Sequence, residues 1–146
     1  MRLERYQLKT NKAYETFSFI SEGPRGNIEK RIIYSKMQNY DVFNLAFGDK
    51  IKGSQEIDDS AVTDNKDSEK VLATVAASVY VFTEKYPDTW VFLTGSTNSR
   101  TRLYRMGISI YFEELSQDFN IYGRLNNEWI DFEKDTAYTA FLIKRK

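Results

Sequence analysis

The feature of this sequence that most restricts its possible folds is a change in the spacing of apolar residues along the chain. Between Tyr14 and Phe47, large apolar residues alternate with polar ones, as Phe17 and Phe19 do around Ser18. This period of two is typical of half-buried strands. From residue 72 to residue 86, apolar side chains recur every three or four positions, as in an amphipathic helix. Strand-like runs return afterwards, so the sequence predicts a mixed α+β domain.

Turn residues show how the strands connect. Gly23-Pro24-Arg25-Gly26 predicts a hairpin loop between the first two runs, and the run from Tyr40 to Phe47 predicts a third strand. Asn126-Asn127 predicts a tight turn between strands at 119–124 and 128–132, because Asn tolerates a positive φ. The apolar tail, Tyr138 to Ile143, predicts a last strand.

Two helices are expected. The first carries Leu72, Val75, Val79, Phe82 and Tyr86 on one side; Asp64 or Asp67 would cap it, and Pro87 ends it. A short apolar strand at 90–94 leads into the second helix, at about 99–115. We therefore expect the order βββαβαββ, with a largely antiparallel sheet of five to seven strands and both helices mainly on one face.

Residues 48–66 lose all periodicity and predict a long exposed loop. The acidic residues in and after it do not follow the order of a calcium-binding loop. We therefore expect a solvated segment and no metal site. The acidic residues in question are Glu56, Asp58, Asp59, Asp64, Asp67 and Glu69.

Composition removes several chemistries. The 146 residues, expected to form a single domain over 1–146, contain no His and no Cys. Disulfides, Cys/His zinc sites and imidazole acid–base catalysis are therefore excluded. The most apolar stretch, Val71 to Phe82, is interrupted by Thr74 and Ser78 and is too short for a membrane span. We expect a soluble cytoplasmic protein without a cofactor, and no membrane partner.

One segment has a pattern that suggests binding chemistry. Between Gly95 and Arg105, a Gly-Ser-Thr turn leads from an apolar strand into a helix that carries three arginines. The first turn of a helix presents unpaired N–H groups and a partial positive charge, and guanidinium groups grip phosphate oxygens in bidentate fashion. We expect a phosphate or carboxylate site formed by Gly95, Ser96, Thr97, Ser99, Arg100, Arg102 and Arg105.

A simpler interpretation of this segment stays open. Ser99 or Thr101 would only cap the helix, and the arginines would pair with carboxylates such as Glu113 and Asp88. The segment matches neither the P-loop nor the dinucleotide-binding glycine pattern. Tyr104, although it lies between two arginines, falls on the apolar side of the helix and is expected in the core.

The run Gly95-Ser96-Thr97-x-Ser99-Arg100-Thr101-Arg102-Leu103-Tyr104-Arg105, together with the ending Phe141-Leu142-Ile143-x-Arg145-Lys146, resembles a family of small uncharacterised bacterial proteins. The likeness covers most of the chain. It implies a bacterial cytosolic origin and one compact domain, and it brings no reaction, cofactor or catalytic residue.

Several functions remain open at this level. The first is a non-enzymatic module whose arginines bind a phosphate-containing ligand, a nucleic acid or an acidic protein. The second is an enzyme acting on a phosphate ester or nucleotide, with Glu113 or Glu114 as the base. Chains of this size also serve as toxin–antitoxin or defence components. Exposed strand edges at 119–124, 128–132 or the tail would allow a homodimer.

Overall fold

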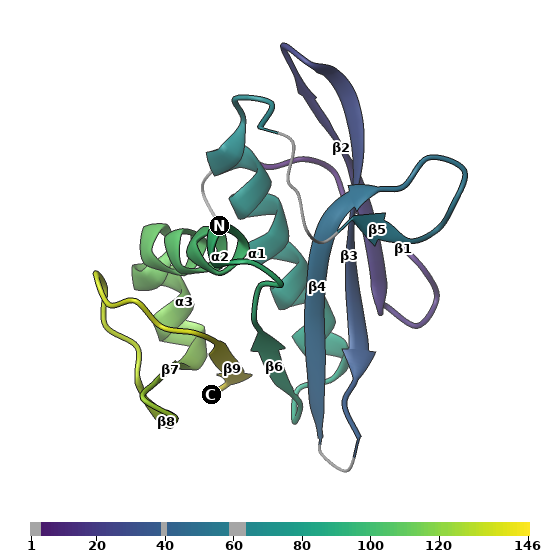
Figure 1. Cartoon of the computed structure of the whole chain (residues 1–146). Helices are drawn as coiled ribbons and strands as arrows, with labels where there is room; N and C mark the ends of the chain where they lie inside the picture. The colour runs from purple at the N-terminus through teal and green to yellow at the C-terminus, as the bar shows by residue number, and fades with distance from the viewer. Residues whose placement is uncertain (1–3, 39–40, 59–63) are drawn as a thin grey trace.

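A nine-stranded sheet forms one layer of the protein (Figure 1). The computed structural model describes residues 4–38, 41–58 and 64–146. Within them the strand order is β1-β2-β3-β4-β6-β9-β7-β8, with β5 also paired to β4. All neighbours are antiparallel except β4 and β6. The strands are β1 Lys9–Thr10, β2 Thr16–Gly23, β3 Gly26–Lys36, β4 Val42–Lys50, β5 Ile57–Asp58, β6 Trp90–Leu93, β7 Phe119–Leu125, β8 Glu128–Asp131 and β9 Phe141–Arg145.

Both predicted hairpins are present. Gly23 pairs with Gly26 across the first turn, and Gly26 has a φ of +92°, which the missing side chain permits. Asn126 and Asn127 join β7 to β8 with φ values of 52° and 64°. Positive φ at both central residues is the geometry that matches the twist of a two-residue hairpin.

In the described parts of the chain, three helices cover one face of the sheet, and the second predicted helix is divided. They are α1 Ser68–Lys85, α2 Asn98–Ile110 and α3 Phe112–Asp118. Helix α1 ends at Tyr86, directly before Pro87, as predicted. The expectation of one continuous helix to Leu115 was wrong, because the chain leaves helical geometry at Tyr111, whose buried side chain donates a hydrogen bond to the carbonyl of Glu69.

The core lies between the helices and the alternating inward side chains of the strands. Tyr34 of β3 stacks on Phe82 of α1 with 4.0 Å between ring centroids, and Phe43 of β4 meets the same ring edge-on. Two residues before Phe82 in α1, Tyr80 packs against Phe119 of β7. Tyr104 is buried, as predicted. The outward side chains of the same strands are covered by no helix of the described chain.

Parts of the predicted sheet were wrong. The sheet has more than five to seven strands because β1 and β5 are two-residue strands too short to produce a periodic pattern. The tail strand, predicted from Tyr138, begins only at Phe141 and lies between β6 and β7 rather than at an edge. Of the three segments proposed as dimer edges, β8 alone is terminal in the sheet order.

The predicted loop at 48–66 is partly strand. Strand β4 continues to Lys50, and β5 returns to pair with Asp49 and Lys50. Asp59, part of the acidic stretch, lies outside the described residues. Strand β3 pairs with one edge of β4, and both β5 and β6 pair with the other edge. Positions 46–48 of β4 lie between the segments paired with β5 and β6, so the sheet is split at this point.

Among the residues that the structure describes, no helix is both long and apolar enough to cross a membrane.

Candidate functional site

A cavity of about 350 Å³ lies beside this split, between the beginnings of α1 and α2. Its volume is within the range of small-molecule sites, about 300–1,000 Å³. The described wall has a charged part and an apolar part, the latter from Val71, Leu103 and Met106. The polar lining residues are Lys30, Asp64, Asn65, Asp67, Ser68, Thr97, Ser99 and Arg100.

A buried ion pair forms the floor next to the sheet. Lys30 occupies an inward position of β3 and lies directly opposite Asp49 of β4. Its ammonium group donates to Asp49 Oδ1 at 2.5 Å, and the side chains are 0% and 18% exposed. Lys30 lines the cavity, and its ammonium nitrogen lies 5.9 Å from the centroid of the Phe47 ring.

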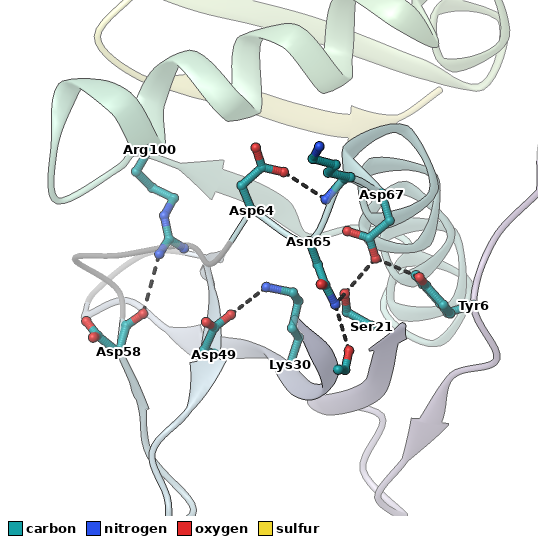
Figure 2. Close-up of polar contacts among 11 residues, drawn as sticks. Tyr6, Ser21, Lys30, Asp49, Asp58, Asp64, Asn65, Asp67 and Arg100 are labelled. Carbon is teal, nitrogen blue, oxygen red and sulfur yellow. Dashed lines mark hydrogen bonds and ion pairs between the residues drawn. The ribbon is translucent and has the colours of Figure 1, made fainter. Parts of the chain in front are cut away.

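Arg100 brings a second buried cation to the cavity wall. It precedes Tyr104 and Ile108 on the inward side of α2, and it is 3% exposed. The guanidinium lies over the ring of Phe47, 5.6 Å from its centroid, and donates to the carbonyl of Asp58 at 3.4 Å. Figure 2 shows Arg100 reaching from α2 toward β5, at the split in the sheet.

The segment leading into α1 is fixed to the β2–β3 hairpin by Asn65. Its amide oxygen accepts from the Arg25 amide at 2.7 Å, and its amide nitrogen donates to the Gly26 carbonyl at 2.9 Å and to Ser21 Oγ at 3.2 Å. Asn65 is 1% exposed. Gly23 permits this approach, since a Cβ there would lie 2.1 Å from the Asn65 carbonyl oxygen. The buried state of Asn65 corrects the expectation of a wholly exposed loop.

Asp67 stands at the start of α1, where a cap was predicted, but its side chain makes no capping hydrogen bond. The carboxylate instead accepts from Tyr6 Oη and Ser21 Oγ, both at 2.6 Å (Figure 2). Burial raises the pKa of Tyr6, and the hydrogen bond to Asp67 raises it further. The phenol therefore stays protonated and keeps donating to Asp67.

The structure divides the predicted anion site between two hollows. Thr97, Ser99 and Arg100 line the cavity described above. Gly95, Arg102 and Arg105 line a second hollow of about 380 Å³, together with the segment 137–139. Ser96 is exposed and lines neither. The three arginines thus do not converge on one point, because Arg100 lies on the inward side of α2 and Arg102 on the exposed side.

Gly95 and Thr97 have roles in forming the helix. Thr97 Oγ1 accepts from the Arg100 amide at 3.2 Å, so Thr97 is the cap rather than Ser99 or Thr101. The Gly95 amide donates to Thr101 Oγ1 at 3.0 Å. A Cβ on Gly95 would lie 2.4 Å from the Thr101 nitrogen, so the turn needs glycine for close packing against α2.

The other predicted partners lie elsewhere. Within the described residues, no ion pair joins Arg102 or Arg105 to Asp88 or Glu113. Glu113 and Glu114, the bases that an enzyme interpretation proposed, belong to α3 and are not among the described lining residues of the cavity.

Residues 2–146 match the model of a family of unknown function, DUF6934. The chain belongs to this family. The match extends over nearly the whole chain, which agrees with the resemblance to uncharacterised proteins noted in the sequence. No curated protein and no solved structure matches the chain. Membership in DUF6934 assigns no activity, so the geometry of the cavity has to carry the functional argument.

Proposed function

We propose that this DUF6934 protein binds a small ligand in the cavity between α1 and α2, through a phosphate or carboxylate group held at Lys30 and Arg100. The observation that carries the proposal is the burial of these two cations, from segments 70 residues apart, in the wall of one cavity. Burying charge costs free energy, and a concave pocket with a few convergent polar or charged groups in an otherwise apolar lining is typical of a ligand site.

The same wall suggests what the rest of the ligand is like. Val71, Leu103 and Met106 offer apolar contact next to the charged groups. Hydrogen bonds from charged donors are strongest when the donor is shielded from water. Arg100 is buried, whereas Arg102 in the second hollow is exposed, so the cavity is the more favourable anion site. A ligand with one anionic group and an apolar body fits this wall best.

The carboxylates in the wall, Asp64 and Asp67, and Asp49 beside it are compatible with an anion because each already accepts hydrogen bonds. Asp49 accepts from Lys30, Asp67 from two hydroxyl groups, and Asp64 from the Lys66 amide at 2.9 Å. Asp64 is also exposed, whereas Lys30 and Arg100 are buried. The more deeply buried charges of the cavity wall are therefore cationic.

Calorimetric titration with phosphate, sulfate and a mononucleotide tests the proposal. Arg100→Lys keeps the charge but loses the planar fork, so binding should weaken roughly tenfold, the cost of about one charged hydrogen bond. The matched control is Arg102→Ala, two residues away on the exposed side of α2, which should bind like the wild type. If Arg102→Ala abolished binding while Arg100→Lys preserved it, the anion would belong in the second hollow; if the wild type bound none of the probes, the proposal would fail.

A further inference from the structure

The face of the sheet opposite the helices carries an unusual set of side chains. Outward positions of β6, β7 and β8 present four aromatic rings, none of which is fully buried: Trp90, Phe92, Tyr122 and Trp129. Most outward positions of β2 and β3 are small, polar or aliphatic, among them Thr16, Ser18 and Ile33. The rings are therefore concentrated on one half of the sheet, which we call the aromatic face.

The strand register places these rings next to one another. Trp90 and Tyr122 lie with centroids 5.8 Å apart, and Phe92 meets Trp129 edge-on at 6.2 Å. Phe92, Leu142 and Tyr122 form one row across β6, β9 and β7. Trp129 lies on the edge strand β8 and is 38% exposed. The rings thus form two neighbouring pairs on one face rather than isolated surface residues.

Cations accompany the rings. Lys144 Nζ lies 5.3 Å from the centroid of the Trp90 ring, and the Arg124 guanidinium lies 5.8 Å from that of Trp129. Asn44 and Asn120 add amide groups to the same rows. Asp131 is the one carboxylate at the outward positions of β6, β7, β8 and β9. The face therefore offers flat apolar rings in a mildly positive setting.

We propose that the aromatic face binds single-stranded nucleic acid, with bases stacked on the rings and phosphates near Arg124 and Lys144. Aromatic rings stack on bases of any sequence, and flanking cations neutralise the backbone, which is the usual design of single-strand binding surfaces. A second copy of this chain is the competing occupant, because aromatic side chains and Arg are also enriched at protein–protein interfaces; the Lys144 ammonium over Trp90 favours the nucleic acid, since Lys is depleted at such interfaces and neutralises phosphates. This site is separate from the cavity between α1 and α2.

Fluorescence anisotropy with labelled oligothymidylate and oligouridylate of about 12 nucleotides tests the proposal and separates DNA from RNA as the source. We expect binding at about 50 mM salt that weakens steeply by about 200 mM. Trp129→Ala should lower affinity roughly tenfold, as expected from losing one stacked base, whereas Trp129→Phe keeps a ring and most of the affinity. Lys144→Ala should reduce the salt dependence by about one ion.

Lys85→Ala is the matched control, because it also removes a cation over an aromatic ring, that of Tyr14 at 6.0 Å, but on α1. It should leave oligonucleotide affinity unchanged. Phosphate binding in the cavity should be unaffected by Trp129→Ala, so the two proposals fail independently. Absence of oligonucleotide binding at low salt, or equal affinity of Trp129→Ala and wild type, overturns the proposal. A concentration-dependent dimer that Trp129→Ala disrupts, without oligonucleotide binding, would assign the face to a second copy.

Discussion

Replacing Lys30 with Met tests whether the cavity floor is a true buried ion pair. Met keeps most of the side-chain volume but removes the ammonium group that bonds Asp49 at 2.5 Å. Breaking one partner of a buried pair costs about 3–5 kcal/mol, because the remaining charge is left in a poorly solvated site. Asp49 is 18% exposed and can recover some hydration, so we expect a cost near the lower limit, about 3 kcal/mol.

The reverse substitution should cost more. Asp49→Leu removes the carboxylate that pairs with the Lys30 ammonium, and the Lys30 side chain is 0% exposed. We expect a loss near the upper limit, about 5 kcal/mol. The double variant, Lys30→Met with Asp49→Leu, replaces the pair by apolar groups and should return close to the wild-type free energy of unfolding. The asymmetry between the single variants follows directly from the difference in exposure.

Urea denaturation followed by circular dichroism measures all four proteins. The coupling free energy of the double-mutant cycle should be several kcal/mol, and Lys30→Met should lower the melting temperature by roughly 6–12 °C. A loss below about 1 kcal/mol in Lys30→Met, or additive effects in the double variant, would refute the view that this pair is desolvated.

Three further outcomes follow from the contacts around the cavity. Gly23→Ala should destabilise the fold by about 2–3 kcal/mol, because its Cβ would lie 2.1 Å from the Asn65 carbonyl oxygen. Gly53→Ala, which has open space around the new Cβ at φ +78°, should cost only about 1 kcal/mol. Equal losses of stability for the two variants in thermal melts would contradict this. Asn65→Asp keeps the acceptor for the Arg25 amide but removes the donor to Gly26 and Ser21, so urea titration should show a loss of about 2 kcal/mol at neutral pH that shrinks in acid. The pKa values of Tyr6, Tyr34, Tyr80 and Tyr111 are raised, chiefly by burial, so the folded state holds these protons above pH 10, the ordinary value, and stability that is intact below that pH should fall as pH rises. Tyrosinate absorbance should rise at higher pH in the folded protein than in the urea-unfolded protein, and coincident titration curves for the two would contradict this.

Much of the fold was accessible from local pattern. The hairpin at Gly23 and Gly26, helix α1 and the Asn126-Asn127 turn follow from period and turn chemistry, which depend on neighbours in sequence. The position of β9 between β6 and β7 does not, because strand order depends on contacts between distant segments. The break at Tyr111 likewise depends on a hydrogen bond to Glu69 on another helix.

The candidate site was predicted only in part, although the sequence contained usable evidence. Lys30 alternates with Ile32 and Tyr34 on the inward face of β3, and Asp49 follows Leu45 and Phe47 on that of β4. A charged residue at an inward position of each of two paired strands indicates a buried ion pair. Arg100 is similarly four residues before Tyr104, on the apolar side of α2. Asn65 gave no such evidence, because its partners come from the β2–β3 hairpin.

Mapping phosphate binding by two-dimensional NMR of the backbone amides tests the central claim most directly. If a ligand phosphate is held at Lys30 and Arg100, titration should shift the amides of Thr97, Ser99, Arg100 and Asn65, which line the cavity. The amides of Ala137 and Thr139, at the second hollow, should stay in place. Shifts confined to the second hollow, or none anywhere at saturating phosphate, would contradict the account.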